Sequence, residues 1–180
     1  MSFLSHFNFK SFLKSSFLVK AILSLLVLAA RFVGLPPNFS PIGGYGFTAK
    51  SLVLFYLPIV LFDWQVSGFY TGFIFTYLGF FSYFLLGRLS RGQFKKQLLL
   101  LPIASFLFFL ISNFGVWLFW YPQTLSGLLA CYLAAIPFYG NTLMGDLVFG
   151  TGFILLYKIA QSKLVNFNQV IDNFKQPTFN

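Results

Sequence analysis

The sequence predicts an all-α membrane protein, a polytopic bundle of spanning helices in one domain. Of its 180 residues, 58% are hydrophobic and only 8% are charged. So few charges could not keep that much apolar surface in solution. The net charge of +9 does not indicate a nucleic-acid partner, because the basic residues stand at the ends of apolar runs and form no patch with polar neighbours. They are typical of residues that orient a protein in a lipid bilayer.

The chain divides into a short basic start, an apolar bundle and a polar tail. We expect a cytoplasmic N-terminal segment at 1–16, a transmembrane domain at 17–160 and a polar cytoplasmic tail at 161–180. The first apolar run, 17–33, is either the first span or a signal peptide, since Val27-Leu28-Ala29 is an acceptable cleavage pattern. In both cases the chain next emerges on the outer side.

Two arrangements of six spans fit the apolar runs, and the basic residues discriminate between them. If the Pro- and Gly-rich stretch 36–50 is an outer loop and 124–139 crosses, six Lys and Arg residues lie on each side. If about 38–49 returns through the membrane and about 125–138 forms an outer-side helix, eleven lie inside and only Arg31 lies outside. The positive-inside rule favours this second arrangement, with both termini cytoplasmic. The predicted spans are then about 17–33, 38–49, 51–64, 69–87, 97–116 and 143–160.

The second predicted span is too short to cross the bilayer unaided. Twelve residues of helix cover about 18 Å, against a hydrocarbon core of about 30 Å. Such a segment has to be shielded by neighbouring helices, and Gly43, Gly44 and Gly46 would permit that close packing. A second close helix contact is indicated by the GxxxG spacing of Gly68 and Gly72.

Charged residues on the predicted outer side are few and therefore informative. Two of the three acidic residues, Asp63 and Asp146, lie at or inside span ends, where a carboxylate is costly unless it is paired or solvated. Arg31 is the expected partner, because it is the only cation predicted on that side. A pair of Arg31 with either acid would contribute to a ligand site or would tie helix ends together. Both interpretations stay open.

Sequence motifs of known enzymes are absent, so we expect no enzyme. The chain contains no Walker A motif, no HExxH and no GxSxG. Its single histidine, His6, and single cysteine, Cys131, leave too few groups for a metal site, a catalytic triad or an internal disulfide. We therefore expect no metal and no cofactor.

Six ordered words of sequence stand out between about residues 31 and 160. They are Pro37-Asn-Phe-Ser-Pro-Ile42, Ser112-Asn-Phe-Gly-Val-Trp-Leu118, Tyr121-Pro-Gln-Thr-Leu-Ser-Gly127, Cys131-Tyr132, Ala135-Ile-Pro-Phe-Tyr139 and Asn141-Thr-Leu-Met-Gly-Asp-Leu147. These words resemble an uncharacterised family of small bacterial integral membrane proteins, known only as a domain of unknown function. The resemblance implies a multi-pass protein of the bacterial inner (cytoplasmic) membrane and supplies no activity.

The layout resembles, more distantly, the S components of energy-coupling factor (ECF) transporters. It combines a first span, a Pro-containing outer stretch, a short Gly-rich return and a Gly-Asp pair near an outer helix end. This resemblance implies a membrane-embedded component for uptake that binds a small molecule, vitamin- or cofactor-like, and docks on an ATP-driven energy-coupling module. The alternative is a structural or accessory subunit of a larger membrane protein complex.

Under the first interpretation, residues of the predicted outer side form the binding site. Aromatic side chains would give flat contact with a ring-bearing ligand, a few polar groups would fix its orientation, and segment 125–138 would cap the mouth. The predicted substrate-binding residues are Arg31, Asn38, Phe39, Asp63, Asn113, Trp117, Trp120, Tyr121, Tyr132, Asn141 and Asp146.

Overall fold

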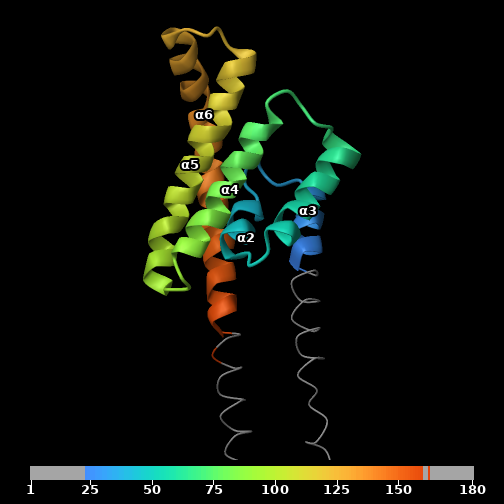
Figure 1. The fold of residues 1–180 in the computed structure, drawn as a ribbon, viewed down its shortest axis with the longest axis vertical. Coiled ribbons are helices and arrows are strands. Elements are labelled where there is room, and N and C mark those ends of the chain that lie inside the picture. Colours follow the sequence, from blue (N-terminus) through green and yellow to red (C-terminus); the bar gives the residue numbers. More distant parts are fainter. Residues whose placement is uncertain (1–22, 160–161, 163–180) are drawn as a thin grey trace, which may run out of the picture.

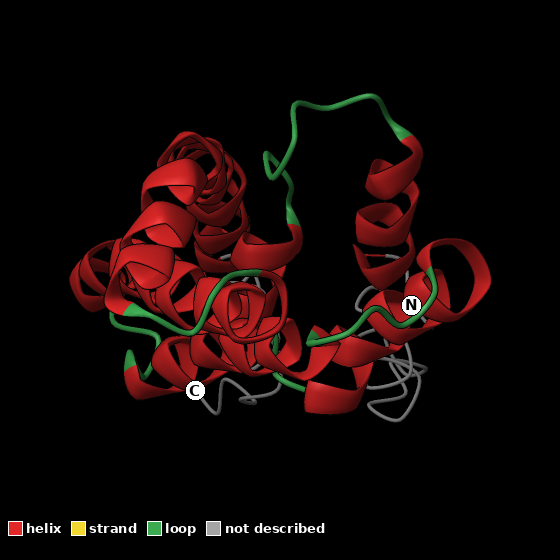
Figure 2. Cartoon of the chain, turned by 90° about the horizontal axis from the view of Figure 1, so that it is seen from above, coloured by secondary structure: helices red, strands yellow, loops and turns green. Residues whose placement is uncertain are grey.

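Helices form all the regular structure in the described part of the chain (Figures 1 and 2). The computed structural model describes residues 23–159 and 162. Its elements are, in order, η1 (Ala30–Phe32), α2 (Ile42–Thr48), α3 (Leu52–Phe62), η2 (Asp63–Ser67), α4 (Phe73–Leu89), α5 (Phe94–Trp120), α6 (Leu125–Gly145) and η3 (Asp146–Gly150). No strand occurs among these residues, so the predicted all-α class is confirmed. The predicted N-terminal segment 1–16 and, apart from Ser162, the predicted tail 161–180 lie outside the described residues.

Two of the described helices are long and apolar enough to cross a membrane. α5 has 27 residues, and α6 continues through η3 to Ile159 as one helix of 35 residues. At about 1.5 Å per residue these helices are about 40 Å and about 52 Å long, both more than the hydrocarbon core needs. Shorter apolar helices cover Leu23–Phe32, Leu52–Val66 and Phe73–Leu89. The six spans and their orientation stay predictions.

The continuity of α6 corrects one prediction. A separate helix at 125–138 along the outer side does not form, and the predicted span 143–160 is the second half of the helix Leu125–Ile159. Gly140 and Asn141 lower the local hydropathy, but neither residue requires a non-helical backbone. Pro137 lies inside the helix, where it removes one backbone hydrogen bond without ending the helix.

α2 is a short, glycine-rich helix within the predicted span 38–49. It packs against α4, α5 and η3, and every residue from Ile42 to Phe47 is buried. The approach depends on glycine, because a Cβ atom at Gly44 would lie 2.5 Å from backbone atoms of Gly150, and one at Gly46 would overlap the ring of Phe55. The predicted shielding is therefore confirmed, for a helix of seven residues.

The predicted helix contact between Gly68 and Gly72 is wrong. Both residues have positive φ angles, 70° and 89°, and lie in the connection between η2 and α4. Glycine adopts this backbone region without steric cost. These two glycines therefore form no GxxxG motif within one helix, although a Cβ atom at Gly72 would lie 2.9 Å from the Phe119 ring of α5.

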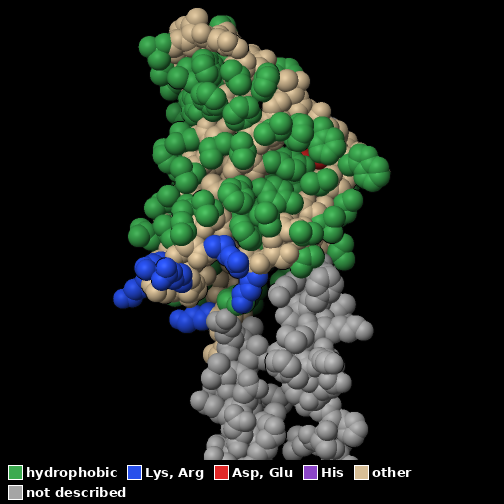
Figure 3. Space-filling view, viewed as in Figure 1, with side chains coloured by type: hydrophobic (Ala, Val, Ile, Leu, Met, Phe, Trp, Pro, Cys, Tyr) green, Lys and Arg blue, Asp and Glu red, His purple; other side chains and the backbone are tan. Residues whose placement is uncertain are grey.

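Basic side chains gather at one end of the described structure (Figure 3). Lys50, which follows α2, lines the same cavity as Arg88 and Arg91 from the turn between α4 and α5. Lys158 lies 4.5 Å from the centre of the Phe94 ring, at the start of α5. Lys50 is therefore beside the 88–96 turn, as both predicted arrangements require, whereas Lys158 at the same end fits only the eleven-to-one arrangement. Which side of a membrane this end faces stays a prediction.

Candidate ligand-binding cavity

A cavity of about 420 Å³ lies at the end of α2 opposite Lys50, and we name it the Arg31 cavity. The connection from η1 to α2 forms one wall, and the end of α3 with α4, α5 and α6 forms the others. Its lining residues are Ala30, Arg31, Val33, Leu35, Pro36, Pro37, Asn38, Phe39, Ser40, Ile42, Gly43, Phe62, Asp63, Tyr70, Thr76, Phe80, Tyr83, Phe108, Thr142 and Asp146. Most of this lining is apolar or aromatic, and opposite charges stand on its wall.

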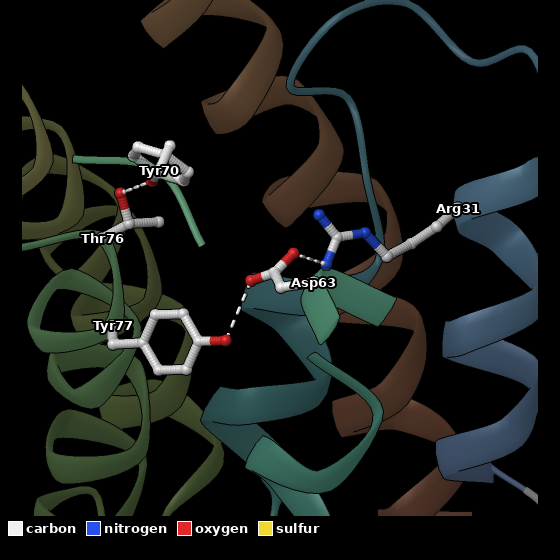
Figure 4. Close-up of polar contacts among 5 residues, drawn as sticks. All are labelled: Arg31, Asp63, Tyr70, Thr76 and Tyr77. Atoms are coloured by element: carbon white, nitrogen blue, oxygen red, sulfur yellow. Dashed lines mark hydrogen bonds and ion pairs between the residues drawn. The ribbon is translucent and has the colours of Figure 1, made fainter. Parts of the chain in front are cut away.

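Arg31 and Asp63 form an ion pair on this wall (Figure 4). The Arg31 Nη1 atom lies 3.7 Å from Asp63 Oδ1, and the Tyr77 hydroxyl donates to Asp63 Oδ2 at 2.9 Å. Arg31 also stacks over the Phe62 ring, with its guanidinium carbon 4.0 Å from the ring centre. The ion pair is looser than a hydrogen bond, and Nη1 is buried without a hydrogen-bond acceptor. A guanidinium carries five N–H donors, so this group retains capacity for an acceptor.

The segment between η1 and α2 covers the cavity and is held from α6. Asn38 has a φ of 65° and lies within a turn in which the Phe39 N–H donates to the Pro36 carbonyl at 3.0 Å. The Asn141 side chain donates to the Pro37 carbonyl at 3.0 Å, and the Phe39 ring packs edge-on against Phe149 at 5.4 Å. This segment occupies the position of the cap that the sequence assigned to residues 125–138.

Asp146 is the centre of a buried cluster that also contains Tyr83, Ser105 and Gly44. Its side chain accepts hydrogen bonds from the Ser105 hydroxyl at 2.6 Å, from the Tyr83 hydroxyl and from the Gly44 backbone N–H. The residue is only 2% exposed. A Cβ atom at Gly43 would overlap Asp146 Oδ1, so glycine is required there. We call these residues the Asp146 cluster; it joins α2, α4, α5 and the α6 helix.

The two open pairings of Arg31 are thereby distinguished. Arg31 pairs with Asp63, and Asp146 is stabilised by neutral donors. A carboxylate in low-dielectric surroundings needs several such donors in place of a cation. We therefore interpret Asp146 as a residue that ties helices together. Its carboxylate lines the Arg31 cavity, as the Arg31–Asp63 pair does.

Five of the predicted residues meet in the Arg31 cavity, namely Arg31, Asn38, Phe39, Asp63 and Asp146. Asn113 lines an adjoining cavity of about 220 Å³, which shares Asn38, Tyr70, Thr76, Phe108 and Thr142 with the first. Asn141 lines neither cavity, but its hydrogen bond to Pro37 positions the covering segment.

Four predicted aromatic residues line neither cavity. Trp117 donates to the Pro122 carbonyl at the turn between α5 and α6, Trp120 is 65% exposed at the end of α5, and Tyr121 follows it. Tyr132 donates to the Leu110 carbonyl at 2.7 Å and packs edge-on against Phe109. For Trp117, Trp120 and Tyr121 the reason is length: α5 extends beyond the predicted span, and α6 continues alongside it, so this turn projects past the cavity (Figure 1).

Residues that sequence reasoning missed are mainly hydroxyl-bearing. Tyr83 and Ser105 bind Asp146, Tyr77 binds Asp63, and Tyr70 and Thr76 bind each other on the cavity wall. A hydroxyl within an apolar span usually faces the bundle interior, and that signal was available in the runs that contain Tyr83 and Ser105. No three His, Cys, Asp or Glu residues of the described part lie together as metal ligands would.

The sequence matches a family described as "Family of unknown function (DUF6580)" over residues 11–170. The chain belongs to this DUF6580 family. Its six sequence words had indicated an uncharacterised family, and that resemblance is confirmed. No curated protein and no solved structure matches the chain. Membership of DUF6580 supplies no activity, so any function has to be argued from the cavity.

Proposed function

We propose that this DUF6580 protein is a membrane-embedded binding component for uptake of a small molecule, vitamin- or cofactor-like, and is not an enzyme. The observation that carries the proposal is the Arg31 cavity. Its volume of about 420 Å³ falls in the range of about 300–1,000 Å³ that small-molecule sites occupy. It combines largely apolar walls with a few convergent polar groups, as such sites do.

The lining favours a flat, ring-bearing ligand with an anionic or acceptor-rich group. Phe39, Phe80 and Phe108 offer aromatic contact. Arg31, whose side chain is 25% exposed, offers N–H donors that Asp63 does not fully use. A ligand carboxylate or carbonyl that binds this guanidinium would gain a charge-assisted hydrogen bond.

The proposal includes an orientation and a partner. The chain would sit in the bacterial inner membrane as a multi-pass protein with six spans and both termini cytoplasmic, because eleven of its twelve basic residues would then lie inside. The Arg31 cavity, at the opposite end of α2 from Lys50, would open outward. As in the ECF S components that the layout resembles, the bound molecule would be released after docking on an ATP-driven module.

The test is ligand retention by the full chain. We expect native mass spectrometry of protein purified from membranes in mild detergent to reveal a bound small molecule, and a panel of vitamins to include one that raises the thermal midpoint. Arg31→Gln should lower the affinity for that ligand by about tenfold or more, since a lost hydrogen bond to a charged group is worth about 1.5–3 kcal/mol.

The matched control is Lys96→Gln, which removes the same charge at the other end of the molecule and should leave ligand affinity unchanged. Without ligand, both variants must unfold at the same thermal midpoint as the wild type, which shows that their fold is intact. The proposal would be contradicted if purified protein repeatedly contained no bound small molecule and no vitamin raised its thermal midpoint of unfolding.

An accessory subunit of a larger complex is the second candidate function. It is favoured by the projecting α5–α6 turn, where Phe119, Trp120 and Leu125 are 49%, 65% and 73% exposed. Co-purification separates the two functions. A stable, stoichiometric partner other than an ATPase module, with an empty Arg31 cavity, would establish the subunit.

A further inference from the structure

The basic end of the molecule contains a second polar cavity, which we name the basic cavity. Its volume is about 430 Å³, and it lies between the connection from α2 to α3 and the turn from α4 to α5. Lys50, Arg88 and Arg91 line it, together with Gly92 and Gln97. Three cations on two different connections thus converge on one hollow.

The described acidic residues do not neutralise these arginines. Within residues 23–159 the acids are Asp63, which pairs with Arg31, and Asp146, which is held by its cluster. The contact found for the Arg88 guanidinium is the Phe84 ring, at 5.6 Å. The two guanidinium groups, with no described carboxylate in ion-pair distance, repel one another, and an anion in the hollow would relieve this repulsion.

Backbone geometry defines the turn that carries the two arginines. Arg91 has a φ of 50° and Gly92 a φ of 71°, so two successive residues adopt the left-handed region in this turn. The Arg91 N–H donates to the Arg88 carbonyl at 3.1 Å. For a non-glycine residue this conformation is uncommon, and here it closes the turn that carries both guanidinium groups.

A separate apolar cavity adjoins the basic one. It has a volume of about 370 Å³ and shares Thr48, Ala49, Lys50 and Tyr157 with the basic cavity. Its remaining lining consists of Leu23, Tyr45, Ser51, Leu54, Phe153 and Leu156. At the boundary, the Lys50 ammonium lies 4.4 Å from the centre of the Tyr157 ring. A single ligand that fills both cavities needs an anionic head and an apolar chain.

We propose that the basic and apolar cavities together form a binding site for an anionic phospholipid. Arg88 and Arg91 bind the phosphate, because guanidinium groups match phosphate oxygens in geometry as well as charge. Lys50 stands where the head group joins the chains, and one acyl chain lies along the apolar cavity. The site is at the end where Lys and Arg gather (Figure 3), the end that faces the anionic leaflet in the predicted orientation. This site is independent of the Arg31 cavity.

The experiment is a lipid titration of delipidated full chain in detergent, followed by native mass spectrometry. Phosphatidylglycerol and phosphatidylcholine with the same acyl chains are compared for wild type, for Arg88→Gln/Arg91→Gln and for Lys95→Gln/Lys96→Gln. The last pair is a matched control, because it removes two exposed charges at the same end but outside the cavity. We expect the Arg pair to weaken phosphatidylglycerol binding by about tenfold or more and the Lys pair to change it by less than about twofold.

Two further arms distinguish a lipid from free phosphate. Short-chain phosphatidylglycerol should bind more weakly than the long-chain lipid, and Leu156→Asn should remove most of that difference by making the apolar cavity polar. Inorganic phosphate at the same concentration should not displace the long-chain lipid. The proposal would be overturned if the Arg pair and the Lys pair weakened phosphatidylglycerol binding equally. It would also be overturned if the wild type bound phosphatidylcholine as well as phosphatidylglycerol, or if inorganic phosphate displaced the long-chain lipid.

Discussion

At the scale of single residues, two described acids have different surroundings and different roles. Asp63 has a cation 3.7 Å away on the cavity wall. Asp146 has only the neutral donors of its cluster, which come from three other helices. Removing its acceptor oxygens would therefore leave buried donors unsatisfied on several helices at once.

We predict that Asp146→Asn lowers the free energy of unfolding by about 1–3 kcal/mol, the usual cost of a buried unsatisfied donor. An amide has one acceptor oxygen where a carboxylate has two. If that oxygen keeps the Gly44 N–H, the Ser105 hydroxyl can still donate to the Leu101 carbonyl, but the Tyr83 hydroxyl loses its acceptor. Denaturant titration of the detergent-solubilised protein measures the effect.

Ser105→Ala is the comparison for this prediction. It leaves the carboxylate with two donors, so the expected cost is smaller, about 0.5–1.5 kcal/mol. If Asp146→Asn left stability unchanged while ligand binding was lost, the Asp146 cluster would belong to the ligand site and would not be a structural tie.

At the scale of elements, some helices could be predicted from hydropathy and charge, whereas the extent of others is decided by packing in the folded chain. The short helix α2 was predictable because the eleven-to-one distribution of basic residues favoured a segment there and because closely spaced glycines permit close approach. The unbroken α6 was not, since hydropathy treats Asn141 as a break while the helical backbone continues through it. In the same way, Arg31 and Asp63 could be identified by their scarcity, whereas the distance of Trp120 from the Arg31 cavity depends on the length of α5, which the sequence did not reveal.

We predict that Gly44→Ala destabilises the protein by about 1–3 kcal/mol, because the added methyl group would press against the backbone of Gly150, which cannot move aside as a side chain can. Gly152→Ala, on the α6 helix, is the control. Nothing lies within 4 Å of its added Cβ atom, and alanine favours the helix by up to about 1 kcal/mol. Thermal unfolding in detergent should move in opposite directions for the two variants; equal shifts would mean that α2 and η3 are not packed through Gly44.

At the scale of the whole molecule, α2 separates two chemically different ends. The Arg31 cavity adjoins its first residues, and the basic cavity adjoins its last. Binding of a solute from outside and contact with an anionic cytoplasmic leaflet would therefore occur at opposite ends of one short, buried helix. Both proposals depend on the same orientation in the membrane, although neither depends on the other.

That orientation can be measured by cysteine labelling. In a Cys131→Ala background, which removes the buried native thiol, we introduce either Lys95→Cys at the basic end or Gln123→Cys at the α5–α6 turn, both at exposed positions. In spheroplasts, whose inner membrane is intact and accessible, a membrane-impermeant thiol reagent should label Gln123→Cys. It should label Lys95→Cys only after lysis, because the basic end is expected inside. The reverse pattern would direct the Arg31 cavity toward the cytoplasm and exclude uptake from outside. Labelling of both positions without lysis would show that α5, which lies between them, does not cross the membrane.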